Sequence, residues 1–280
     1  MRNAACLVRG GLRLLSPEDF FDLERFSHRD LFSNLGLVWE ALPRVKEYLA
    51  RSIPPGLPHD LPLARPLDRT LIMHQGRLFD AEGNVEIVSG DATKGKMAVL
   101  KKGKALEGAS VLYAGSVFFD SAIAIGEGVV VEPGALIKGP TIVGNRTEIR
   151  QGAYIRGSCL IGARCVVGHV TEMKNSLMLD DAKAGHFAYL GDSILGFNCN
   201  LGAGTKLANL RFISNPITLS IEGKAYQTGL RKLGAIAGDE VQTGCNSVTN
   251  PGSILGRGTF VYPNITVAGG YYRPGSIIRK

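Results

Sequence analysis

The apolar residues in the middle of this 280-residue chain recur every six positions. Counting from Ile125, every sixth residue is aliphatic or sulfur-containing, at Ile125, Val131, Ile137, Val143, Ile149, Ile155, Ile161, Val167, Met173 and Leu179. Neither an α-helix, with its 3.6-residue period, nor a simple strand, with its period of two, keeps this spacing. A six-residue repeat is typical of a parallel β-helix, in which short strands form flat faces around a shared core. The pattern therefore predicts a β-helical prism.

The repeat is interrupted twice. After Leu179 it resumes in a new phase at Tyr189, Leu195, Leu201 and Leu207. We therefore expect residues 180–188, which include His186, to absorb a shift in register. The second interruption covers residues 209–232, and a weaker phase then runs through Ala237, Thr243, Thr249, Leu255, Val261 and Val267. Because long loops in compact domains commonly carry function, we expect this one to reach across a groove.

The first hundred residues follow other patterns. Ser16-Pro17-Glu18-Asp19 has the capping residue, proline and acidic first turn of a helix start. A helical stripe follows at Leu31, Leu35, Val38, Leu42, Val45 and Leu49, in which Pro43 is expected to introduce a kink. Further on, residues 80–84 have the composition of a hairpin turn between short β-type runs.

Proline content marks a boundary before the prism. Five prolines between residues 53 and 66 predict a stiff, extended linker. We therefore divide the chain into three parts. These are a helical N-terminal module with its linker at 1–66, short β segments at 67–104, and the β-helix at 105–280 with its inserted loop at about 209–232.

Composition and charge narrow the class of protein. The five cysteines form no C-x-x-C pair, which disfavours a disulfide framework or a zinc knuckle. Residues 1–15 hold three arginines and no continuous apolar run, and no later segment is long enough to cross a bilayer. We therefore expect a cytoplasmic protein without a membrane partner. The net charge of +7 comes with few aromatic residues, so we expect anionic small molecules rather than nucleic acid as partners.

Motifs between residues 150 and 250 carry a resemblance to a known family. The first group comprises Arg156, Thr171-Glu172-Met173-Lys174, Ala184-Gly185-His186-Phe187-Ala188-Tyr189-Leu190-Gly191-Asp192 and Asn200-Leu201-Gly202-Ala203-Gly204-Thr205. It closely resembles the acetyltransferase half of the bifunctional glucosamine-1-phosphate acetyltransferase and N-acetylglucosamine-1-phosphate uridyltransferase family. A second group, Ala208-Asn209-Leu210-Arg211 and Gly229-Leu230-Arg231-Lys232-Leu233-Gly234-Ala235, is similar to the archaeal-type sugar-1-phosphate nucleotidyltransferases that carry the same prism. The resemblance covers about residues 120–270, and no counterpart of the nucleotidyltransferase half is expected.

The resemblance implies a left-handed parallel β-helix that assembles as a homotrimer. It implies an acyltransferase that moves the acetyl group of acetyl-CoA to an amino-sugar phosphate such as glucosamine-1-phosphate, with no metal required. His186 falls on the general base and Asn209 on a position near the acetyl group. Substrate-binding positions fall on Arg156, Lys174, Tyr189, Asn200 and Lys232. Coenzyme-contacting positions fall on Ala203 and Cys245.

The chemistry of an amine attacking a thioester agrees with these roles. The amine must lose a proton as the tetrahedral intermediate forms, and histidine is the side chain whose ordinary pKa lies near working pH. Backbone N–H groups of residues 202–204 and the amide of Asn209 are candidate donors to the anionic oxygen. Arg156 offers a fork for a phosphate, and Lys174 and Lys232 offer point charges.

Other functions stay open at this point. One is an acyltransferase acting on a different sugar or a nucleotide sugar. Another is a non-catalytic trimeric scaffold whose helical stripe binds a partner. A third is metal-dependent hydration, since one class of carbonic anhydrase uses this fold, but His169 and His186 lack a close third histidine. We expect His169 and the other histidines, His28, His59 and His74, to be structural or exposed.

Overall fold

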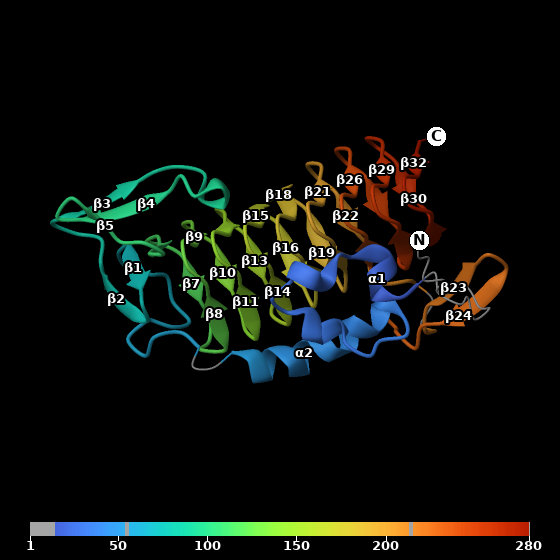
Figure 1. Ribbon diagram of the computed structural model, residues 1–280, viewed down its shortest axis with the longest axis horizontal. Helices are drawn as coiled ribbons and strands as arrows, with labels where there is room; N and C mark the ends of the chain where they lie inside the picture. The colour runs from blue at the N-terminus through green and yellow to red at the C-terminus, as the bar shows by residue number, and fades with distance from the viewer. Residues whose placement is uncertain (1–14, 54–55, 213–214, 280) are drawn as a thin grey trace, which may run out of the picture.

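The computed structural model describes residues 15–53, 56–212 and 215–279, which form a mainly β structure built around a long parallel β-helix (Figure 1). Cys6 and the arginines of residues 1–14, as well as Pro54 and Pro55, lie outside the described residues. Within the described residues, no helix is long and apolar enough to span a membrane.

Three parallel sheets form the faces of the prism. The first face comprises β6 (Ser110–Leu112), β9 (Val130–Val131), β12 (Glu148–Ile149), β15 (Val166–His169), β18 (Lys183–His186), β21 (Asn200–Leu201), β26 (Gln242–Thr243), β29 (Phe260–Val261) and β32 (Ile277–Ile278). The second face comprises β7 (Val117–Phe118), β10 (Leu136–Ile137), β13 (Tyr154–Ile155), β16 (Glu172–Lys174), β19 (Tyr189–Gly191), β22 (Lys206–Leu207), β27 (Val248–Thr249) and β30 (Thr266–Val267). The third face comprises β8 (Ile123–Ile125), β11 (Thr141–Val143), β14 (Cys159–Ile161), β17 (Leu177–Met178), β20 (Ile194–Leu195), β25 (Ala235–Ala237), β28 (Ser253–Leu255) and β31 (Gly270–Tyr272).

The predicted six-residue ladder fills the core of the prism. Its members from Val131 to Met173 are buried together, and Ile125 packs against them. Stacking the strands of successive coils in register places each inward side chain on the one below, so that one continuous apolar column excludes water. The β-helix predicted from the period is therefore confirmed.

The predicted change of phase occurs earlier than the sequence indicated. Ile161 pairs with Met178 and Met173 with Leu190, which are spacings of 17 residues rather than 18. The corners after Met173 and after Leu190 are each a residue short, so the inward positions are Met178, Ala184 and Leu190 instead of Leu179 and Tyr189, and Leu195 follows as the next inward residue. Leu179 is buried in a separate cluster with residues of the N-terminal module, and Tyr189 is only partly buried.

The second interruption corresponds to an insertion between β22 and β25 (Ala235–Ala237). Leu195 pairs with Ala237 and Leu201 with Thr243, so the ladder resumes where the weaker phase was expected. The inserted residues include an antiparallel hairpin of β23 (Thr218–Ile221) and β24 (Lys224–Gln227).

The N-terminal module is a chain of short helices. Helix α1 (Pro17–Phe20) has the predicted cap, because the backbone N–H and hydroxyl of Ser16 donate to Asp19 at 2.8 and 3.0 Å. The single kinked helix expected next is wrong. The segment folds into 3₁₀ turns η1 (Leu23–Arg25), η2 (Arg29–Phe32) and η3 (Val38–Glu40), followed by α2 (Ala41–Ser52). Pro43 lies in the first turn of α2, where a helix needs no N–H donor, so it does not interrupt the helix.

The module covers the third face of the prism (Figure 1). Trp39, Leu42 and Leu49 are buried in one cluster with outward residues of that face, including Leu160 and Ile194. The apolar stripe identified in the sequence is therefore buried by packing within the chain. Among the described residues, no residue from a strand of the first or second face belongs to this cluster.

The segment before the prism adds an antiparallel hairpin to the end of the first face, next to β6, and forms a separate three-stranded antiparallel sheet. Strands β1 (Leu71–His74) and β2 (Arg77–Asp80) form a hairpin that turns at Gln75 and Gly76, both with positive φ. The turn expected at residues 80–84 is wrong, because β3 (Val85–Val88) pairs with β4 (Ala98–Lys101) instead of β2. Turn η4 (Ala92–Lys94) precedes β4, and β5 (Lys104–Ala105) follows it. We call residues 85–105, which hold β3, η4, β4 and β5, the flap. The amide of Ala92 donates to the buried carboxylate of Glu148 at 2.8 Å, which fastens the flap to the first face.

Candidate functional site

The corner between the first and second faces brings together three of the residues named from the sequence. His186, Ala203 and Cys245 occupy the same position in successive coils, and His169 occupies it one coil earlier. Backbone hydrogen bonds fix this alignment, since the N–H of Gly204 donates to the carbonyl of His186 at 3.1 Å. We call His169, His186, Ala203 and Cys245 the histidine edge.

The two imidazoles of this edge are stacked. Their ring centroids lie 5.6 Å apart with an interplanar angle of 25°, because parallel pairing sets His169 of β15 directly against His186 of β18. The ring of His186 is exposed, whereas His169 is half-buried and also lines a hollow of about 580 Å³ beneath the flap. His169 thus covers one side of the His186 ring, and the exposed remainder of the ring is open to a ligand.

A buried polar cluster occupies the opposite edge of the second face. Asp192, with 6% of its surface exposed, accepts a hydrogen bond from Nδ2 of Asn209 at 2.5 Å and one from Nδ2 of Asn175 at 2.8 Å. The ammonium of Lys174 lies 3.7 Å from the same carboxylate. Lys174, which is expected to bind substrate, and Asn209, which is expected near the acetyl group, are therefore joined through a carboxylate. We call Lys174, Asp192, Asn209 and Tyr189 the amide cluster.

Tyr189 completes the amide cluster. Its hydroxyl donates to Oδ1 of Asn209 at 3.4 Å. Burial, together with the nearby carboxylates of Glu172 and Asp192, raises the pKa of Tyr189, so the phenol keeps its proton. The amide of Asn209 donates one hydrogen to Asp192, and its carbonyl oxygen accepts from Tyr189, so the hydrogen bonds among the described side chains use only one of its two amide hydrogens.

Arg156 lies one coil before Lys174 on the same face. Its guanidinium donates to Oε1 of Glu172 at 2.7 Å, and this hydrogen bond raises the pKa of Arg156. In register, Glu172 lies between Tyr154 and Tyr189. An anionic ligand that uses Arg156 must therefore compete with a carboxylate already in place.

The other predicted residues are more dispersed. Asn200 projects from the first face between Lys183 and Gln242, so it is not part of the amide cluster. Lys232 is exposed and forms a backbone bridge with Leu210, which places it beside Asn209 at the base of the insertion. The structure thus gathers most of the predicted residues along the two edges of the second face and leaves Asn200 apart.

Three residues near these groups, His169, Glu172 and Asp192, are not among the site residues predicted from the sequence. The signal for each was present, because all three lie 17 or 18 residues from a named residue and therefore one coil away. The buried cysteines are poor nucleophiles, since burial raises the pKa of the Cys159 and Cys199 thiols to about 12. In the described part of the chain, no three metal-binding side chains of the His, Cys, Asp or Glu type lie together.

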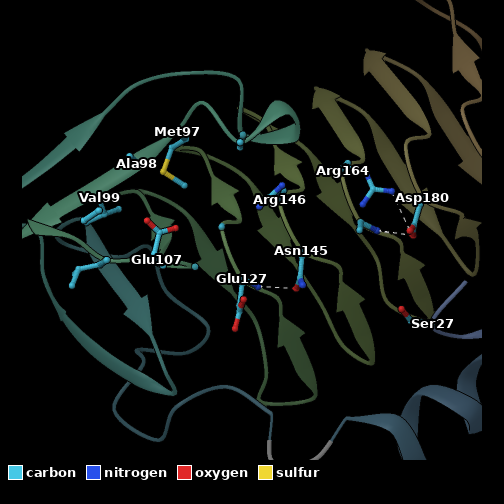
Figure 2. A pocket seen from close by; sticks show the side chains of 18 residues that line it. Ser27, Met97, Ala98, Val99, Glu107, Glu127, Asn145, Arg146, Arg164 and Asp180 are labelled. Carbon is cyan, nitrogen blue, oxygen red and sulfur yellow. Dashed lines mark hydrogen bonds and ion pairs between the residues drawn. The ribbon is translucent and has the colours of Figure 1, made fainter. Parts of the chain in front are cut away.

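A separate cavity lies on the far side of the flap, at the corner between the third and first faces. It has a volume of about 530 Å³, and its polar lining includes Glu127, Arg146, Arg164 and Asp180 (Figure 2). Arg164 donates to Asp181 at 2.7 and 2.8 Å, so much of its charge is balanced within the chain. None of the site residues named from the sequence lines this cavity.

The fold and the two polar edges define a hexapeptide-repeat β-helix related to acetyltransferase domains. The chain belongs to the family of the GMPPB C-terminal domain, whose model matches residues 137–278. Among curated relatives, the bifunctional protein GlmU of Methanococcus maripaludis is 42% identical over 100 residues, which is 36% of this chain and 24% of that protein. The bifunctional sugar-1-phosphate nucleotidylyltransferase/acetyltransferase of Sulfurisphaera tokodaii is 39% identical over 101 residues, covering 36% of this chain and 25% of that protein.

The chain therefore spans about a quarter of the length of these relatives. Among solved structures, a putative acetyltransferase of Bacillus cereus matches with a TM-score of 0.29 at 14% identity, covering 54% of this chain and 74% of that chain. The resemblance to the acetyltransferase region of the GlmU-type relatives, predicted from the motifs, is confirmed.

Proposed function

We propose that this protein is an acetyl-CoA-dependent N-acetyltransferase acting on an amino-sugar phosphate such as glucosamine-1-phosphate. The observation that carries the proposal is the alignment of an exposed imidazole, His186, with Ala203 and Cys245 along one edge, next to a face that carries Lys174, Tyr189 and Asn209. The homology to acetyltransferase regions of bifunctional relatives agrees with it.

The proposed reaction is a direct transfer. The amine nitrogen of the acceptor attacks the thioester carbon, a C–N bond forms, and His186 accepts the amine proton. Collapse of the tetrahedral intermediate breaks the C–S bond, and the imidazolium returns its proton to the leaving thiolate. No covalent enzyme intermediate is needed. Cys159, Cys165 and Cys199 are buried, and the exposed Cys245 is proposed to contact the coenzyme and not to act as a nucleophile.

The second face supplies the electrostatic part of the proposal. Because Asn209 and His186 lie on opposite edges of the second face, the proposal places Asn209 of one protomer beside His186 of another in the homotrimer. There the second amide hydrogen of Asn209, oriented by Asp192, is a donor for the developing oxyanion. Lys174, Arg156 and Lys232 hold the acceptor's phosphate. Tyr189 packs beside the sugar, and Ala203 and Cys245 contact the coenzyme. Assembly as a homotrimer, with Asn200 reaching a site between protomers, is part of the same proposal.

The structure does not favour a non-catalytic scaffold that binds a partner through its N-terminal module. The apolar stripe of the N-terminal module is buried against the third face and is not presented to a partner. The acyl group and the sugar that the protein uses can be identified by measuring its activity with a panel of acyl-CoA and amino-sugar phosphate pairs.

The deciding experiment measures free thiol released from acetyl-CoA in the presence of glucosamine-1-phosphate. His186→Ala should lower turnover about a hundredfold or more, given the usual contribution of a general base. His59→Ala, at an exposed histidine outside the prism, is the control and should turn over like the wild type. Equal turnover in the two variants would remove His186 from the mechanism.

A further inference from the structure

Two apolar residues occupy backbone positions that the rest of the same corner gives to glycine or asparagine. One position after the histidine edge, successive coils have positive φ, at Gly115, Gly134, Gly152, Gly204, Asn246 and Asn264. The two coils that carry His169 and His186 place Val170 and Phe187 there instead, with φ of 51° and 34°. A side chain with a Cβ is disfavoured at positive φ, and a β-branched or bulky one most of all.

Packing does not explain this choice. Val170 is 64% exposed and Phe187 is 55% exposed, so neither side chain gains much from burial in the chain. At other coil corners, the described non-glycine residues with positive φ are polar or charged. The turn requires a positive φ here but not a bulky apolar side chain, and burial does not offset the strain. The choice of these residues therefore points to a function for the side chains themselves.

The neighbouring coils are shaped to admit these two side chains. A Cβ built on Gly204 would lie 3.2 Å from Cε2 of Phe187, and one built on Gly152 would lie 3.4 Å from Cγ2 of Val170. Phe187 therefore extends over Gly204, beside Ala203, and its ring centroid lies 6.5 Å from that of His186. The result is an apolar ledge, Val170 and Phe187, alongside the stacked imidazoles.

We propose that this ledge binds the acyl-thioester end of the coenzyme and is a determinant of acyl specificity. The inference rests on the proposed function and assigns two further residues to it. The ledge offers no hydrogen bond, so it does not suit a hydroxyl-rich sugar, whereas the acetyl methyl and the adjacent methylenes are apolar. Two side chains also fall far short of the roughly 800 Å² per partner that a stable protein interface needs.

The test uses the double variant Val170→Asn/Phe187→Asn, because asparagine is what this corner already holds at Asn246 and Asn264. Relief of strain should leave the melting temperature unchanged or higher. Loss of the ledge should weaken acetyl-CoA binding, measured by calorimetry without acceptor, about tenfold or more, as expected for removing apolar contacts to a small acyl group. Phe260→Asn, at an exposed phenylalanine elsewhere on the first face, is the matched control.

The outcomes separate this inference from the proposed function. A wild type that does not bind acetyl-CoA contradicts the proposed function and the ledge together. A wild type that binds it, with the double variant binding equally well, overturns the ledge alone. A lower melting temperature or a smaller oligomer in the double variant also overturns it, since the two side chains would then serve packing or a protomer contact.

Discussion

Asp192 and Asn209 are joined by a side-chain hydrogen bond of 2.5 Å that links two adjacent coils at the edge of the second face. The carboxylate is almost fully buried and also holds Asn175 and Lys174. A buried carboxylate with this many donors is costly to disturb, because loss of any partner leaves a desolvated polar group. The amide of Asn209 and the ammonium of Lys174 are therefore set in place before any ligand arrives.

The amide cluster depends on the missing side chain of Gly191. A Cβ there would lie 2.6 Å from both Nδ2 of Asn209 and the hydroxyl oxygen of Tyr189, so Gly191→Ala must displace the cluster. We expect thiol release to fall between tenfold and a hundredfold, since an error of about 1 Å in positioning has effects of that order. Gly185→Ala is the control, because nothing lies within 4 Å of its built Cβ. Similar activities for both variants would show that the cluster is not used in catalysis.

The ion pair between Arg156 and Glu172 predicts a gain of affinity on substitution. Glu172→Gln removes the negative charge that competes with an acceptor phosphate for the guanidinium, so KM for glucosamine-1-phosphate should fall a few-fold. Arg156→Ala should raise it. Glucosamine without phosphate is the control acceptor, and its KM should not respond to Glu172→Gln. An unchanged KM for the phosphorylated acceptor would separate Arg156 from phosphate binding.

The sequence predicted the architecture because a period of six is repeated over many coils and has one structural meaning. It misplaced the change of phase because Met178 and Leu179 are both apolar, and only strand pairing shows which one faces inward. The prediction of a single kinked helix was wrong for a related reason. Residues 31–49 need only present apolar side chains to the third face, and short 3₁₀ turns do this as well as one helix.

The candidate site was predictable in its parts but not in its contacts. Recognisable motifs contain His186, Lys174 and Asn209. Which residues contact them depends on the number of residues in each coil, which the motifs do not give. Asp192 follows Lys174 by 18 residues and precedes Asn209 by 17, so a one-residue error in counting separates them. The strained Val170 and Phe187 carry no sequence signal, because positive φ is visible only in the backbone.

The N-terminal module should loosen in mild acid through His28. Burial lowers the pKa of His28 from its ordinary value of 6.5, and its Nδ1 lies 2.9 Å from the hydroxyl of Tyr48, while Asp180 opposes the shift. Below pH 6.5 the unfolded chain therefore binds a proton that the folded chain does not, so stability is lost as pH falls from 6.5 toward the lowered value. Melting temperatures at pH 7 and pH 5 should differ less in His28→Gln than in the wild type. His59→Gln, at an exposed site, should keep the wild-type difference.

Trp39 connects the N-terminal module to the inserted hairpin. Its ring is 2% exposed and meets Tyr226 of β24 edge-on, with centroids 6.2 Å apart. Trp39→Ala should lower the free energy of unfolding by about 3–5 kcal/mol, as for other large-to-small changes in a core. Because the insertion is rooted at Asn209 and Lys232, the same variant should also reduce thiol release at temperatures where it remains folded.

A double-mutant cycle with Tyr226→Ala isolates the contact. Edge-on aromatic pairs are worth about 0.5–1.5 kcal/mol beyond the area they bury, so the two substitutions should be less than additive by that amount in chemical denaturation. Phe260→Ala, which removes an exposed aromatic ring, should change stability little and show no coupling to Trp39→Ala. Full additivity of Trp39→Ala and Tyr226→Ala would mean that the hairpin is held by the prism alone, and the effect of Trp39 on activity should then vanish as well.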